Sequence, residues 1–129
     1  RNLAAQVAST AQTAEVLNDV GSVLADQGDL AGARSKYEES LAMQREVHGD
    51  RPHPDIAGSL HMIGIVLEKQ GDLAGARSKF QAMLKMYQQL PGDNHAETQR
   101  ARAAVERLET AAAPGEATAL HRLKVPVRA

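Results

Sequence analysis

Apolar residues recur along this chain at spacings of three and four positions, the period at which side chains line one face of an α-helix. The pattern is interrupted by short polar segments rich in glycine, aspartate and proline, which are typical of turns and loops. It therefore predicts five helices, over residues 14–27, residues 30–47, from Pro54 to a break at Gly71, residues 73–90 and residues 96–112.

The polar segments contain residues that end and cap helices. Gly28 and Gly71 are expected to end the helices before them, because glycine adopts backbone conformations that other residues avoid. Asp29 follows directly, and a short carboxylate accepts hydrogen bonds from the free N–H groups of the next helix. Asp72 repeats this arrangement, and Pro54 suits the first turn of the third helix, where a missing N–H costs nothing.

An internal duplication accounts for the alternation of helices and breaks. The ten residues QGDLAGARSK at positions 27–36 recur unchanged at positions 70–79, an offset of 43 residues. Chance identity over so long a segment is negligible. A helical repeat of this length predicts a solenoid, in which each unit buries its apolar face on its neighbours. Such chains usually bind other molecules and rarely catalyse reactions.

Composition favours an all-α fold and excludes several functional classes. Alanine, the best helix former, is the commonest residue at 23 of 129, and aromatic residues make up only 2%. The formal net charge of -1 gives no electrostatic footprint for nucleic acid or for an anionic membrane surface. The absence of cysteine excludes disulfides and thiolate chemistry. No stretch approaches the ~20 apolar residues that a membrane-spanning helix needs.

The two units resemble the tetratricopeptide repeat family. The family pattern combines large apolar residues, a glycine at the helix contact, a helix-breaking glycine, an alanine, an aromatic residue and a small residue. The offset of 43 and the step His53-Pro54-Asp55 are similar to the longer units of kinesin light chains. The matching positions are Leu17, Val20, Gly21, Gly28, Ala33, Tyr37 and Ser40 in the first unit, and Leu60, Ile63, Gly64, Gly71, Ala76, Phe80 and Met83 in the second.

Two roles follow from the resemblance and two positions depart from it. Gly21 and Gly64 are expected to allow close approach of paired helices, and Tyr37 and Phe80 are expected to wedge against the next unit. Met83 is larger than the usual residue at its position. The last helix carries Glu106, rather than glycine, at its helix contact, and its polar character is typical of a capping element.

The resemblance implies a right-handed superhelical solenoid of antiparallel helix pairs, with about five helices and a tail. We expect a remnant of a preceding helix in residues 1–12, repeat units in residues 13–52 and 53–95, a capping helix in residues 96–112 and a tail in residues 113–129. In this family, the first helix of each unit lines a concave groove that receives a peptide. Carried over by position, the groove residues are Glu15, Asn18, Ser22, His61, Met62, Ile65, Glu68, Arg100 and Arg107.

Several of these groove residues also have a plainer interpretation. Asn18 matches an asparagine that bonds the backbone of bound peptide in kinesin-light-chain-like repeats, and an amide suits that task because it both donates and accepts. Asn18 and His61 fit solvated positions on an open helix face equally well. Arg100 and Arg107 could grip an acidic partner, but pairing with glutamates of their own helix is the favoured interpretation.

One loop concentrates residues that can bind metals. His48, Asp50, His53 and Asp55 lie close together in the sequence, and in principle they could hold a divalent ion. No second cluster or regular ligand spacing supports this, and loops between repeats are commonly polar. We therefore predict no metal site and no cofactor.

The sequence predicts a non-catalytic module that binds a peptide or protein segment in its groove, within a larger multidomain protein that contains a preceding repeat. The alternative is an architectural segment that self-assembles through its ends or its tail. Residues 121–128 alternate basic and apolar side chains, and the tail is either a linker, a cover for the last helix or an occupant of a groove. No nucleic acid or membrane partner is expected. The alanine, glycine and arginine usage suggests a bacterial, cytoplasmic protein.

Overall fold

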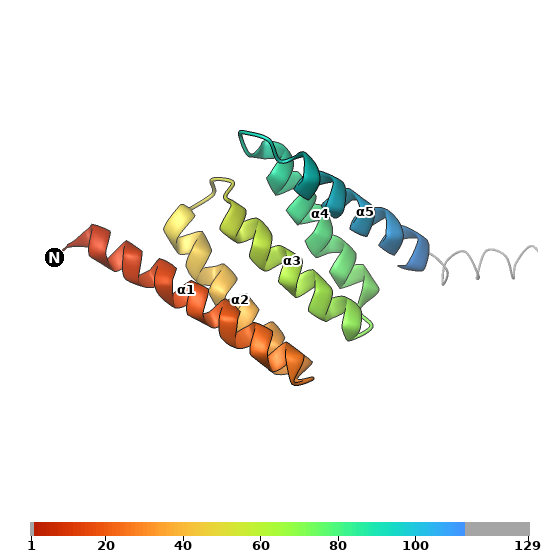
Figure 1. The fold of residues 1–129 in the computed structure, drawn as a ribbon, viewed down its shortest axis with the longest axis horizontal. Coiled ribbons are helices and arrows are strands. Elements are labelled where there is room, and N and C mark those ends of the chain that lie inside the picture. Colours follow the sequence, from red (N-terminus) through yellow and green to blue (C-terminus); the bar gives the residue numbers. More distant parts are fainter. Residues whose placement is uncertain (1, 113–129) are drawn as a thin grey trace, which may run out of the picture.

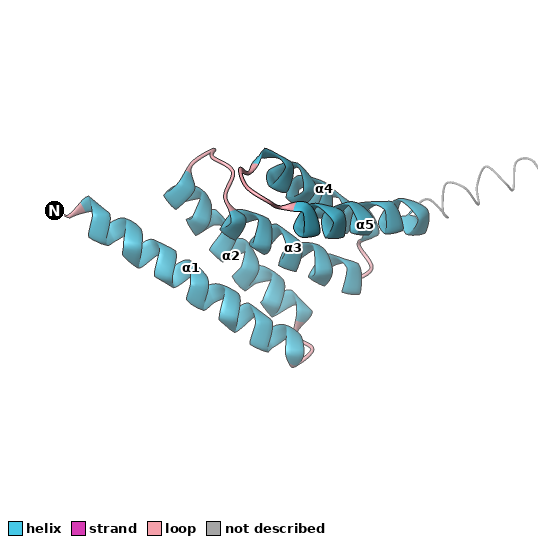
Figure 2. Ribbon diagram, turned by 45° about the horizontal axis from the view of Figure 1, so that its top comes forward, coloured by secondary structure: helices cyan, strands magenta, loops and turns pink. Residues whose placement is uncertain are grey.

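Five helices in a row make up the fold of residues 2–112. The computed structural model describes residues 2–112, so Arg1 and the expected tail lie outside the described residues. Successive helices run antiparallel and lie side by side in chain order (Figure 1). Short loops join them, and the described residues contain no strand (Figure 2). The helices are α1 (Leu3–Asp26), α2 (Leu30–His48), α3 (Pro54–Lys69), α4 (Leu73–Gln89) and α5 (His95–Ala112).

The duplicated turn between the two helices of each unit is built as predicted. Gly28 and Gly71 have φ angles of 86° and 89°, which residues with a side chain rarely adopt. The Oδ1 atom of Asp29 accepts a hydrogen bond from the backbone N–H of Gly32 at 2.9 Å. Asp72 accepts the same bond at the same length in the second unit. Identical sequence therefore gives identical capping in both units.

The structure differs from the expected elements at the N-terminus. We expected the end of one helix in residues 1–12 and the start of another near residue 14, but α1 is a single helix. The threonines of this stretch do not break it, because their hydroxyls donate back to carbonyls one turn earlier. Thr10 bonds Gln6 at 3.0 Å and Thr13 bonds Ser9 at 2.9 Å.

The helices of each pair approach closely at a glycine. A Cβ atom added to Gly21 would lie 2.8 Å from the Tyr37 ring, and one added to Gly64 would lie 2.8 Å from the Phe80 ring. The two rings therefore face the glycine of their own unit, whereas the sequence placed them against the next unit. Both rings are almost fully buried. Large flat side chains on one helix thus pack against small residues on its partner.

A single hydrophobic core runs through the solenoid from α2 to α5. α3 lies in the middle, between α2 and α4, and contributes eight buried residues. α1 lies at one end and contributes two buried residues. Two partly buried apolar residues of α1, Leu24 and Ala25, pack against this core. Burial is therefore unequal along the chain, and α1 is the helix with the least.

Candidate functional site

Two grooves lie between successive first helices of the units. The first groove, between α1 and α3, has a volume of about 740 Å³. The second groove, between α3 and α5, has a volume of about 400 Å³. The first is lined by Ala8, Ala11, Gln12, Glu15, Asn18, Gln44, Pro54, Asp55 and Gly58. The second is lined by His61, Ile65, Phe80, Met83, Arg100, Ala103, Ala104 and Arg107.

These grooves bring together six of the nine residues predicted from the sequence. Glu15 and Asn18 line the first groove. His61, Ile65, Arg100 and Arg107 line the second groove. The grouping follows from helical periodicity, because positions three and four apart on α3 and on α5 lie on the same face.

The remaining three predicted residues make contacts within the protein. The Ser22 hydroxyl lies 2.9 Å from the Tyr37 hydroxyl, so it joins α1 to α2. Met62 is half-buried and packs against the hydrophobic core. Glu68 forms a two-point ion pair with Arg107, in which Arg107 Nη2 donates to Glu68 Oε1 at 3.1 Å and Nη1 donates to Oε2.

This ion pair replaces the pairing expected for Arg107. The sequence favoured a glutamate of its own helix, but Glu68 belongs to α3, so the pair joins the two walls of the second groove. The bond from Glu68 raises the pKa of the Arg107 guanidinium above its ordinary value. Both side chains retain substantial exposure, which limits the contribution of the pair to stability.

A polar chain lies along the wall of the first groove. Asn18 Nδ2 donates to Ser59 Oγ at 3.3 Å, and Ser59 Oγ donates to Gln44 Oε1 at 2.7 Å. The Asn18 Oδ1 atom is buried and has no hydrogen-bond partner in the described part of the chain. A buried acceptor without a partner is costly, so this oxygen favours any N–H donor that reaches it.

Sequence reasoning did not identify Gln44 as part of the first groove. Gln44 belongs to the second helix of its unit, whereas the family pattern assigns the groove to first helices. It is nevertheless 6% exposed and holds Ser59 in place. Gln44 follows Tyr37 and Leu41 at helical spacing, so the sequence places it on the buried face of α2. A buried amide needs hydrogen-bond partners, and this requirement could have identified Gln44.

The second groove combines an apolar floor with positive charge. The His61 ring lies 5.9 Å from the Phe80 ring in a tilted arrangement. Burial lowers the pKa of His61 below its ordinary value of 6.5, and the nearby positive charge of Arg100 lowers it further. His61 is therefore neutral at pH 7. Arg100 lines the groove and forms no ion pair within residues 2–112.

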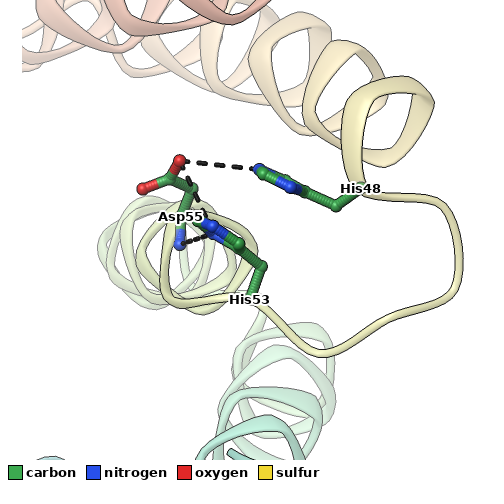
Figure 3. A group of neighbouring side chains, drawn as sticks. All are labelled: His48, His53 and Asp55. Carbon is green, nitrogen blue, oxygen red and sulfur yellow. Dashed lines mark hydrogen bonds and ion pairs between the residues drawn. The ribbon is translucent and has the colours of Figure 1, made fainter.

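Three members of the metal-capable loop also come together, without Asp50. The candidate ligand atoms of His48, His53 and Asp55 lie within 4.8 Å of one another (Figure 3). Their contacts have another explanation. His53 Nδ1 already accepts the backbone N–H of Asp55 at 3.0 Å, which caps α3. His48 and His53 also stack with ring centroids 3.5 Å apart and planes 13° from parallel.

The stacked rings do not aim at a common point. Imidazole lone pairs lie in the ring plane, and a zinc–nitrogen bond is about 2.1 Å long. An ion bonded to both stacked rings would therefore lie far outside both ring planes. Coordination would require the His48 and His53 rings to rotate and the α3 cap to break. The cluster is thus a helix cap and a contact between the two units.

Comparison with known proteins identifies the repeats. Residues 12–89 match the family model described as Tetratricopeptide repeat, a span that covers more than half of the chain and reaches from α1 to the end of α4. A search of curated proteins and a search of solved structures gave no significant match. Among the helices of residues 2–112, none is long and apolar enough to cross a membrane.

Proposed function

Because the chain belongs to the tetratricopeptide repeat family, whose repeats are generally protein–protein interaction modules, we propose that its two grooves bind an extended peptide segment of a partner protein. The family is typically non-catalytic, and the proposed role is binding alone. The single observation that carries the proposal is Asn18, which lines the first groove and whose buried amide oxygen has no hydrogen-bond partner among residues 2–112; rotation of this amide toward the groove would let it accept a backbone N–H of the peptide.

The second groove defines the chemistry of the side chains that it accepts. Ile65, Ala103 and Ala104 offer apolar surface to an aliphatic or aromatic side chain, above the buried Phe80 and Met83. The positive charge of Arg100 favours an acidic side chain beside it. His61 is neutral and adds no competing charge at pH 7. The proposed ligand therefore combines one apolar residue, one neighbouring acidic residue and a backbone free to bond Asn18.

Selection from a display library of short random peptides tests this proposal. Peptides enriched on the full chain should share an apolar residue beside an acidic residue. Their affinity, measured by fluorescence polarisation, should fall about tenfold or more for Asn18→Ala and for Arg100→Glu. Lys85→Glu is the matched control, because Lys85 is exposed on α4 and lines neither groove.

The two outcomes are distinct. Equal losses for Arg100→Glu and Lys85→Glu would show that peptide binds by net charge rather than in the second groove. Enrichment of no peptide, with the variants folded by circular dichroism, would contradict binding in either groove.

A further inference from the structure

The outer face of α1 carries apolar side chains that no described part of the chain covers. Val16 and Val23 are each 54% exposed, and Val20 is 39% exposed. They lie three and four positions apart, so they form one stripe, which we call the valine face. A contiguous exposed apolar stripe on a helix marks a contact surface more often than isolated apolar residues do.

The repeat shows what covers the equivalent stripe in the second unit. The positions 43 residues later are Ser59, Ile63 and Val66 of α3, and all three are buried. Ser59 Oγ donates to Gln44 of α2, so this stripe of α3 faces the second helix of the preceding unit. The Gly64 side of α3 faces Phe80 of α4 instead.

α5 repeats this arrangement. It packs on α4, and its buried residues occur at the same spacing as the stripe of α3. In both cases, the covered stripe belongs to a first helix and the cover is a second helix. Of the stripes on α1, α3 and α5, the valine face is therefore the one that no second helix covers within residues 2–112. The buried stripe of α5 consists of Ala101, Val105 and Leu108.

At the opposite end of the described residues, α5 does not offer an apolar surface. The side of α5 that would receive a second helix of its own carries Glu106 where α3 has Gly64. Its other members are also polar and exposed, so they resemble a solvated end. An apolar segment that follows α5 therefore finds no matching face on α5 itself. These residues are Gln99, Arg102, Glu106 and Glu109.

Charge distinguishes the possible occupants of the valine face. α1 carries Glu15, Asp19 and Asp26 and no lysine, arginine or histidine. Asp19 adjoins Val16, Val20 and Val23 on the helix surface, so pairing two copies of α1 would bring like charges together. A segment that is both apolar and basic therefore fits this face best.

The sequence after α5 has both properties. Residues 116–128 contain one acidic residue, Glu116, against three basic residues. Apolar residues are interspersed among the basic ones. This segment also follows α5 at the place in the alternation where a second helix is due. The basic residues are Arg122, Lys124 and Arg128, and the apolar ones include Leu120, Leu123, Val125 and Val127.

We propose that residues 116–128 of one molecule dock on the valine face of a second molecule. The contact continues the order of the solenoid. Within one molecule, the second helix α4 lies between the first helices α3 and α5. In the proposed assembly, residues 116–128 take the corresponding place between α5 of one copy and α1 of the next. The interaction is heterologous, so it joins molecules head to tail. It depends on protein concentration, and salt weakens it because opposite charges contribute.

A photo-crosslinking experiment on the full chain tests the assignment directly. A photoreactive amino acid replaces Val20, and the protein is mixed with an isotope-labelled copy that lacks the photoreactive group. Crosslinked peptides should join Val20 of one copy to residues 116–128 of the other. The weight-average mass by light scattering should rise with concentration and should stop rising in the variants Val16→Lys/Val23→Lys and Leu120→Lys/Leu123→Lys.

Leu3→Lys/Val7→Lys is the matched control. It removes two exposed apolar residues from α1 and adds the same charge, but it lies outside the valine face. Its mass curve should match that of the unaltered chain. Crosslinks within one molecule, crosslinks from α1 to α1, or a monomer at every concentration would each overturn the proposal.

Discussion

At the scale of single residues, the tightest contacts occur where Gly21 and Gly64 meet aromatic rings. We expect Gly64→Ala to destabilise the protein by about 1–3 kcal/mol, because the Phe80 ring is buried and has no room to yield to the new methyl group. Gly21→Ala should act in the same way through Tyr37. Urea unfolding monitored by circular dichroism measures both effects.

Gly58→Ala is the control for this prediction. Gly58 is also a helical glycine, but a Cβ at this position would meet nothing within 4 Å. The substitution should stabilise α3 by about 0.5–1 kcal/mol, because alanine restricts the unfolded chain and fits the helix. A loss of stability at Gly58 equal to that at Gly64 would show that lost glycine flexibility, not the ring contact, is responsible.

His61 gives the stability a specific pH dependence. Its pKa in the folded protein is below the 6.5 of the unfolded chain, chiefly because of burial and secondarily because of Arg100. As the pH falls below 6.5, the unfolded state binds more protons than the folded state, so stability falls. Above that range, His61 is neutral in both states and has no effect.

His61→Gln should remove this dependence. The free energy of unfolding, measured in urea from acid to neutral pH, should decline less steeply below pH 6.5 in the variant than in the unaltered chain. The other titrating groups are common to both proteins and cancel in the difference. Parallel curves for the two proteins would contradict the assignment of this pH dependence to His61.

Some side-chain contacts of the structure could be predicted from the amino-acid sequence, and others could not. The close approach of paired helices at Gly21 and Gly64 was predicted from the family pattern, but the ring that meets each glycine was not, because Tyr37 and Phe80 were expected against the next unit. The Glu68–Arg107 pair was not, because it depends on the relative placement of α3 and α5 and on the side-chain conformations of two long residues. The same is true of the inward-pointing amide of Asn18, which depends on Ser59 and Gln44 of other helices.

At the scale of the helices, the duplicated caps allow a matched test. Asp29→Ala and Asp72→Ala should each destabilise the protein by about 0.5–2 kcal/mol, because each removes one acceptor from an identical turn. Asp29→Asn and Asp72→Asn should retain most of the stability, since asparagine is an equally good N-cap. Thermal unfolding of the four variants checks this, and equal losses for alanine and asparagine would contradict a capping role.

Helix ends were predictable where the sequence contains an unambiguous cap. The start of α2 and α4 at Leu30 and Leu73 follows from the Gly-Asp turn, and both were predicted to the residue. The start of α1 was not, because threonine is compatible both with a cap and with a helix interior. Which of the two occurs depends on whether the chain before it, here Leu3 to Ser9, is itself helical.

At the scale of the whole molecule, the solenoid has unlike ends. One end presents the valine face on α1, and the other presents the polar residues of α5. Stability in such an array is close to a sum over neighbouring contacts, so a helix with one neighbour is held less firmly than a helix with two. α3 has α2 and α4 as neighbours, whereas α1 packs mainly on α2 and meets α3 through the Asn18–Ser59 hydrogen bond.

Amide hydrogen exchange should therefore vary along the chain in a defined order. At low protein concentration, protection should be greatest in α3, which has eight buried residues, and least in residues 3–9 of α1, which are all exposed. Mass spectrometry of exchanged peptides measures this gradient, and uniform protection would contradict it by showing that the helices open together. Raising the concentration should slow exchange around Val20 without changing α3, because the docked segment of a second molecule then holds α1 from its open side.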